Sequence, residues 1–141
     1  MYNVLDDVVP MLVSMLYGTL VGLERQTDKK PAGLRTHTLV CLGATLFVLT
    51  ARHAFLLVGN QSFDPTRIIH GIVTGVGFLG AGSILRHEGT VMGVTTAASI
   101  WMVAAIGAAV GVHAYALAGI STALALIVLQ FYQRIDARVS R

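Results

Sequence analysis

The segment from Val91 to Val112 contains no ionisable side chain, and this feature constrains the fold more than any other. A helix needs about 20 residues to span a hydrocarbon core of roughly 30 Å. Only 12% of the 141 residues are charged and the mean hydropathy is +0.72, whereas an ordinary soluble domain carries about 25% charged residues. The chain has too little polar surface to cover a soluble globule, so we expect an integral membrane protein.

Four further apolar runs cover residues 8–23, 38–58, 68–85 and 114–132. The last two and 91–112 are long enough to span, whereas 8–23 and 38–58 are marginal. The first run spans if flanking residues extend it or the bilayer thins locally, and the second spans if Arg52 snorkels from its outer end. We therefore predict an all-α integral membrane protein: a single domain of about five transmembrane helices, with residues 133–141 as a short basic cytoplasmic tail.

A cleaved signal peptide is the competing interpretation of the first run. A signal peptide carries a basic segment before its apolar region and a small-residue cleavage site after it. Here the charges before the run are Asp6 and Asp7. We therefore retain the first run as a transmembrane helix.

The distribution of basic residues predicts the orientation. Alternation of five helices places Arg52 and Arg67 on one side and the other eight Lys and Arg residues on the opposite side. Basic residues concentrate on the cytoplasmic side of membrane proteins, which places the N-terminus outside and the C-terminus inside. The eight residues are Arg25, Lys29, Lys30, Arg35, Arg86, Arg134, Arg138 and Arg141.

The third run contains the spacing G-x-G-x-x-G at Gly75, Gly77 and Gly80. A dinucleotide site needs a preceding strand and an acid about 20 residues later, but the acids that follow are Glu88 and Asp136. Small residues at four-residue spacing instead let helices approach closely in lipid. We expect the third and fourth runs to pack together, with a third helix that is contacted on several sides, kinked or broken. The expected packing residues are Gly71, Gly75, Gly77, Gly80, Gly82, Thr95 and Thr96.

Polar residues gather where the first and second runs meet their connecting loop. Glu24 can pair with Arg35, and Thr36 is placed to cap the second helix. These charges either anchor the helices at an interface that favours anionic lipid or form a gate or docking surface. The expected polar cluster consists of Glu24, Arg25, Arg35, Thr36 and His37.

Three ordered motifs resemble the membrane domain of the MgtC/SapB family over about residues 10 to 130. They are "GLERQ....KPAGLRTHTLVCLGATLF", "DPTRIIHGIVTGVGFLGAGSILR", which holds the outer charged pair Asp64 and Arg67, and "GVTTAASIWMVAAIGAAVG". The resemblance implies a bacterial inner-membrane protein linked to growth at low magnesium and to survival inside phagocytes. It also implies regulation of other membrane proteins, with ATP synthase and cation-transporting ATPases as candidate partners. Many members continue into a cytoplasmic domain of the ACT type, which we expect this chain, ending at Arg141, to lack.

The residues themselves favour a non-enzymatic regulator over a transporter. Carriers usually hold an ionisable residue at mid-membrane, and four of the five runs have none there. The topology separates His87 from His70 and His113, which disfavours a metal site, and no catalytic arrangement is evident. The alternative is a magnesium or other cation channel with a carbonyl-lined filter in the glycine-rich run. We expect no cofactor, nucleotide or nucleic acid; the expected partners are membrane lipid, a second copy in a homodimer, and another inner-membrane complex.

Overall fold

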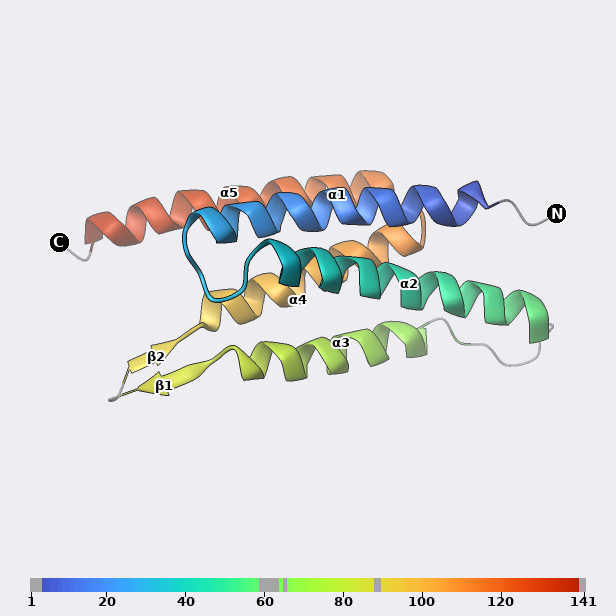
Figure 1. The fold of residues 1–141 in the computed structure, drawn as a ribbon, viewed down its shortest axis with the longest axis horizontal. Helices are drawn as coiled ribbons and strands as arrows, with labels where there is room; N and C mark the ends of the chain where they lie inside the picture. Colours follow the sequence, from blue (N-terminus) through green and yellow to red (C-terminus); the bar gives the residue numbers. More distant parts are fainter. Residues whose placement is uncertain (1–3, 59–63, 65, 88–89, 140–141) are drawn as a thin grey trace.

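The computed structural model describes residues 4–58, 64, 66–87 and 90–139. Five helices run side by side, and a short antiparallel hairpin lies at one end of the bundle (Figure 1). The predicted all-α bundle of five helices is confirmed. The elements in chain order are α1 (Leu5–Thr27), α2 (Leu34–Val58), α3 (Thr66–Gly82), β1 (Leu85–His87), β2 (Thr90–Met92), α4 (Val94–Gly111) and α5 (Tyr115–Val139).

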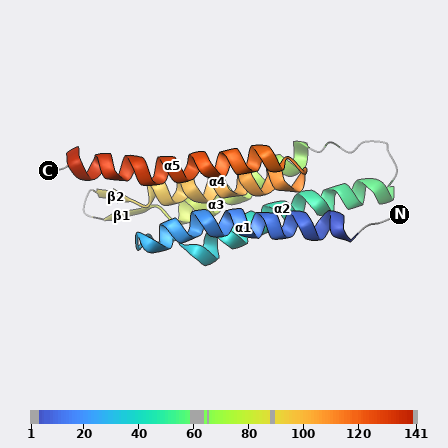
Figure 2. The same cartoon turned by 90° about the horizontal axis from the view of Figure 1, so that it is seen from above.

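Helix α4 is the centre of the bundle. It contacts each of the other four helices, and Figure 2 shows it between α5 and α1. A helix that is apolar on all sides is stable when it is surrounded, and α4 carries apolar or small residues around its whole circumference. Val103, Ile106 and Val110 are at most 1% exposed, so the middle of the bundle is filled by packed side chains.

Two pairs of glycines bring α1 and α4 close to α2. Gly18 and Gly22 lie one turn apart on α1, and Gly107 and Gly111 lie one turn apart on α4. A Cβ at Gly18 would lie 2.8 Å from Cys41 Cβ, and one at Gly107 would overlap the Cys41 carbonyl oxygen. In lipid, such small-residue faces allow backbones to pack closely, which makes α2 the helix held between two glycine pairs.

The structure places the five glycines of α3 differently from the expectation that all of them take part in helix packing. A Cβ at Gly80 would lie 3.5 Å from Ala97 Cβ on α4, which is ordinary contact. For the other four, Gly71, Gly75, Gly77 and Gly82, no described atom beyond the neighbouring backbone of α3 itself lies within 4 Å of such a Cβ. The reason is geometric, because α3 buries one narrow face through Ile72, Val76 and Gly80 and leaves its remaining circumference open.

Helix lengths also differ from the expected spans. The two runs predicted to be marginal form α1 and α2, of 23 and 25 residues, because both helices continue through the polar residues at their ends. Among the described residues, four helices are long and apolar enough to cross a membrane, namely Leu5–Thr27, Leu34–Leu56, Val94–Gly111 and Tyr115–Tyr132. Helix α3 has 17 residues, which is close to the lower limit for a span.

The hairpin shortens both the third and the fourth expected spans. Residues assigned to helix at 85 and at 91–92 instead pair as strands, with Leu85 opposite Met92 and Arg86 opposite Val91. Gly93 joins β2 to α4 with a φ of 87°, and a Cβ there would overlap the carbonyl oxygen of Ser83. Glycine is therefore required at this turn, because the backbone is left-handed there and because the residues that follow α3 lie too close to leave room for a side chain.

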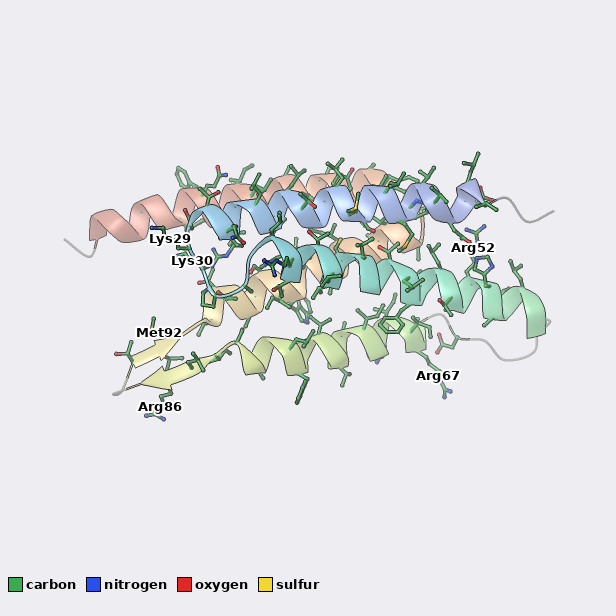
Figure 3. All side chains as sticks on the ribbon, in the orientation of Figure 1. Lys29, Lys30, Arg52, Arg67, Arg86 and Met92 are labelled. Carbon is green, nitrogen blue, oxygen red and sulfur yellow. The ribbon has the colours of Figure 1, made fainter. Side chains whose placement is uncertain are left out.

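Basic side chains separate between the two ends of the bundle. Lys29, Lys30 and Arg86 lie at the end that holds the hairpin, whereas Arg52 and Arg67 lie at the opposite end (Figure 3). This is the separation from which the sequence predicts the orientation, and it is retained among these five residues. We refer to these ends as the hairpin end and the Arg67 end.

Candidate functional site

A buried polar cluster lies near the hairpin end, between α1, α2 and α4. We define it as Glu24 and Arg25 of α1, His37 of α2, and Thr96 and Ser99 of α4. His37 is fully buried, and its Nε2 lies 2.9 Å from Ser99 Oγ, while Nδ1 lies 2.9 Å from the Gly33 carbonyl oxygen. The His37 contact joins two helices through residues far apart in the sequence.

The hydrogen-bond partners constrain the proton on His37. The Gly33 carbonyl can only accept, so Nδ1–H donates to it. In the neutral ring, Nε2 then accepts a hydrogen bond from the Ser99 hydroxyl. The same hydroxyl can instead donate to the Thr96 carbonyl, 2.8 Å away, and a hydrogen bond between His37 and Ser99 then requires a second ring proton on Nε2. The Ser99 hydroxyl therefore has two possible acceptors, and its choice is coupled to the charge of His37.

Glu24 and Arg25 form a buried ion pair. Arg25 Nη1 lies 3.8 Å from Glu24 Oε2, and the two side chains are 3% and 6% exposed. This distance is too long for a hydrogen bond, and among the described residues neither Glu24 oxygen nor Arg25 Nε has a hydrogen-bond partner. The attraction is Coulombic, and removing one partner would leave an uncompensated buried charge.

The predicted pairing of Glu24 with Arg35 is not what the structure contains. Arg35 is exposed, and Glu24 forms its ion pair with the neighbouring Arg25. Adjacent residues on a helix diverge in direction, but Arg25 turns inward between the helices and reaches the carboxylate. Of the five residues expected in the cluster, Glu24, Arg25 and His37 belong to it.

The expected cap at Thr36 is also wrong. Helix α2 begins at Leu34, so Thr36 lies inside its first turn. The Leu34 N–H donates instead to Gln26 Oε1, at 3.3 Å, and thus α1 supplies the acceptor for the start of α2. An N-cap residue precedes the first helical residue, and the sequence did not reveal this earlier start or the cap from another helix.

Two further hydrogen bonds connect α2 to its neighbours, and no sequence pattern predicts either of them. Thr45 Oγ1 donates to the Gly107 carbonyl oxygen on α4 at 2.7 Å, and Thr19 Oγ1 lies 3.2 Å from Thr38 Oγ1. The first is buried at the closest approach of α2 and α4. Of the two threonines predicted to mediate packing, Thr96 is 2% exposed and Thr95 is exposed.

At the Arg67 end, charged residues form local contacts. Arg52 Nη2 lies 4.0 Å from Asp6 Oδ2, and His53 Nε2 lies 2.8 Å from Asp7 Oδ2, so α1 and α2 are joined at this end as well. In the sequence, these two acids argue against a signal peptide but do not indicate these contacts. Their proximity follows from the antiparallel packing of α1 on α2.

Asp64 and Arg67, expected as an outer charged pair, are placed at the start of α3. Asp64 Oδ1 accepts from the Thr66 N–H at 2.9 Å and from Thr66 Oγ1 at 2.6 Å. These hydrogen bonds hold the pKa of the Asp64 carboxyl below its usual range. Asp64 therefore acts as a cap for α3, and the structure contains no ion pair of 4.0 Å or less between it and Arg67 among the described residues.

An apolar groove of about 810 Å³ separates α2 from α3, and we call it the α2–α3 groove. It exists because α3 packs on α4 and leaves its side toward α2 open. Gly43, Gly71 and Gly75 line it without side chains, Arg67 lies at one end and Leu79 near the other. Two of the α3 glycines predicted to pack therefore line a groove.

The described residues contain no group of three His, Cys, Asp or Glu side chains placed to hold a metal ion. The organised polar features are thus the buried cluster, the capped ends and the threonine contacts. Around them, many large apolar side chains are exposed, including Phe78 at 81% and Leu39 at 67%. Such a surface is suited to contact with lipid or with other membrane helices.

Known proteins similar to this chain share most of its length. "Putative magnesium transporter YhiD" of Escherichia coli K12 is 37% identical over 137 residues, covering 95% of this chain and 64% of the relative. "Protein SrpB" of Synechococcus elongatus is 40% identical over 138 residues, covering 89% and 74%. "Protein MgtC" of Salmonella typhimurium LT2 is 42% identical over 104 residues, covering 74% and 42%.

This chain thus spans just under two thirds of YhiD and less than half of MgtC. No solved structure matches it. The profile of the MgtC family matches residues 11–138, which include α2, α3 and α4, most of α1 and α5, and the buried cluster. Together with four helices long and apolar enough to span a bilayer, this match shows that the chain is a multi-pass membrane protein that belongs to the MgtC family.

Proposed function

We propose that this protein is a non-enzymatic regulator in the bacterial inner membrane that binds another membrane protein through helix contacts. The observation that carries the proposal is the contrast between a tightly packed unit of α1, α2 and α4 and a peripheral α3 with an open outer face. Regulators of this kind need a stable scaffold and an exposed helix that a partner can approach.

The outer face of α3 is the proposed docking surface. Thr74 and Phe78 follow the buried Ile72 and Val76 by two residues, which turns them about 200° around the helix axis and away from α4. Gly77 and Ala81 lie on the same open side, one turn apart. This small-xxx-small spacing favours close approach of a partner helix in lipid, and a second copy of this chain is one such partner.

The packed interior argues against conduction through a single chain. Val21, Cys41, Val103, Ile106 and Val110 are at most 1% exposed and fill the space between α1, α2 and α4. A cation path needs polar groups or water along its length, since unpaired charge is expensive in an apolar interior. The name of YhiD nevertheless favours a magnesium channel or transporter as the second candidate.

Flux and capture experiments separate the two functions. The purified protein is reconstituted into liposomes that contain a magnesium-sensitive dye, and empty liposomes serve as the baseline. We expect no flux above that baseline. Magnesium uptake by the purified protein that is abolished by changes in α3 would overturn the regulator proposal.

Capture from membranes tests the docking surface. The tagged protein is expressed in its own host at low magnesium, cross-linked and purified, and the membrane proteins that co-purify with it are identified. The family resemblance makes ATP synthase and cation-transporting ATPases the partners to examine first. Gly77→Leu should reduce the amount of partner severalfold, because a side chain on the outer face blocks close approach. Gly75→Leu, which changes the α2–α3 groove, is the matched control and should retain the partner. Equal capture by wild type and Gly77→Leu would contradict the proposed surface.

A further inference from the structure

We propose that the α2–α3 groove binds one acyl chain of a phospholipid and that Arg67 binds the phosphate of the same lipid. The groove is a lengthwise opening between two helices that touch little, and its lining is almost entirely apolar. Gly43, Gly71 and Gly75 remove side chains from its walls, so a hydrocarbon chain can lie close to the helix backbones.

The length of the groove fits a lipid better than a membrane-spanning helix. At 1.5 Å per residue, the groove follows α3 from Arg67 to Leu79 for about 18 Å and α2 from Leu39 to Ala54 for about 22 Å. One leaflet contributes roughly half of the 30 Å hydrocarbon core, or about 15 Å. Both walls are therefore longer than the acyl region of one leaflet, so they can hold a whole acyl chain, and both are shorter than the roughly 30 Å core along which a spanning partner helix would pack.

Charge complementarity identifies the end at which the head group lies. Arg67 is exposed at the end of the groove and projects from the end of α3 away from the bundle (Figure 3). Arg67 forms no ion pair of 4.0 Å or less with another described residue, and its charge contributes only the weaker, longer-range part of the lowered pKa of Asp64, whose carboxylate hydrogen-bonds to Thr66. A guanidinium binds phosphate through several N–H donors, and a flexible side chain at the interface can reach a head group.

Selectivity should come mainly from the head group. An acyl chain that enters the groove moves from one hydrocarbon environment to another, so it gains contacts but little hydrophobic free energy. The interaction of Arg67 with phosphate adds charge-assisted hydrogen bonds that the acyl chain cannot supply. Losing it should weaken lipid retention more than a change in the groove wall does.

Native mass spectrometry of the intact chain, released from nanodiscs that contain phosphatidylglycerol, tests the proposal. We expect one retained phospholipid per chain. Arg67→Gln should weaken retention about ten- to hundredfold, the range that follows from losing a charge-assisted hydrogen bond. Gly75→Leu should reduce retention by filling the groove, whereas Gly77→Leu, on the open outer face of the same helix, should not. Neither glycine has an atom within 4 Å of an added Cβ, so both variants should fold, and thermal unfolding checks this.

Two arginine controls locate the head group. Arg52→Gln removes a charge at the same end of the bundle but away from the groove, and should leave retention unchanged. Arg35 precedes Leu39 by one turn on the same face of α2, near the opposite end of the groove. Loss of lipid in Arg35→Gln with retention in Arg67→Gln would overturn the assignment of Arg67. Unchanged lipid retention in both Arg67→Gln and Gly75→Leu would overturn the lipid site altogether. If the wild type has the mass of a dimer and Gly75→Leu has that of a monomer, with lipid retention unchanged, the groove binds a second copy of the chain instead.

Discussion

The replacement Gly107→Ala tests how α2 and α4 are held together. The added Cβ would overlap the Cys41 carbonyl oxygen and lie 3.1 Å from Ala44 Cβ. Neither neighbour can move without moving α2, because the first is backbone and the second is attached directly to it. The two helices must therefore separate locally, and a gap of 0.5–1 Å forfeits about a quarter to a half of each affected dispersion contact.

The magnitude follows from three contributions. Overpacking a close contact costs about 1–3 kcal/mol. Separation also stretches the 2.7 Å hydrogen bond from Thr45 to the Gly107 carbonyl, and interhelical bonds in membranes contribute about 0.6 kcal/mol on average. Alanine recovers up to about 1 kcal/mol of helix propensity relative to glycine. We expect the free energy of unfolding to fall by about 2 kcal/mol.

The assay is unfolding by sodium dodecyl sulfate in mixed micelles, followed by far-ultraviolet circular dichroism. Gly77→Ala is the matched control, since it makes the same chemical change on α3 where no atom lies within 4 Å of the added Cβ. That variant should be unchanged or up to about 1 kcal/mol more stable. If Gly107→Ala proves as stable as Gly77→Ala, the close approach of α2 and α4 is not what stabilises the bundle.

Three further changes test other contacts in the same unfolding assay. Thr45→Val keeps the side-chain shape but removes the donor to the Gly107 carbonyl, so it should lower the free energy of unfolding by about 0.6–1.7 kcal/mol; no loss would show that this bond is not stabilising. Gly93→Ala should lower the free energy of unfolding by more than about 1 kcal/mol, because φ at this position is 87° and the added Cβ would meet the Ser83 carbonyl oxygen. Amide hydrogen exchange at Thr90–Met92 should become faster in this variant, and unchanged exchange would contradict the tight turn. Arg25→Met should lower the free energy of unfolding by about 3 kcal/mol, because it leaves the Glu24 carboxylate buried and unpaired. Adding Glu24→Gln to this variant should restore part of the lost stability, whereas additive losses would show that the two side chains are not coupled.

Much of the candidate site could be located from the sequence, although its contacts could not. The sequence predicts that Glu24, Arg25 and His37 share one polar cluster, because they flank a short loop between two apolar runs and antiparallel neighbours bring such ends together. Partner choice depends on side-chain direction, which hydropathy does not contain. The sequence therefore led to Arg35 as the partner of Glu24 and to Thr36 as the cap, where the structure has Arg25 and Gln26.

The sequence by itself determined the class of this protein. Long apolar runs with few charges specify membrane helices because every backbone polar group must be satisfied within lipid, and a helix does this from local sequence alone. The number of helices and the separation of basic residues between the two ends follow from the same one-dimensional pattern. The family motifs add the MgtC assignment, which the match over residues 11–138 shows.

Only the tertiary structure decided which glycines pack. Gly77 and Gly107 are the same residue in similarly apolar helices, but one faces open space and the other faces the backbone of α2. The contacts of Thr45 with Gly107 and of His37 with Ser99 each join residues 62 positions apart. Such contacts depend on how whole helices cross and rotate, so local composition shows that close packing is possible and the three-dimensional arrangement decides where it occurs.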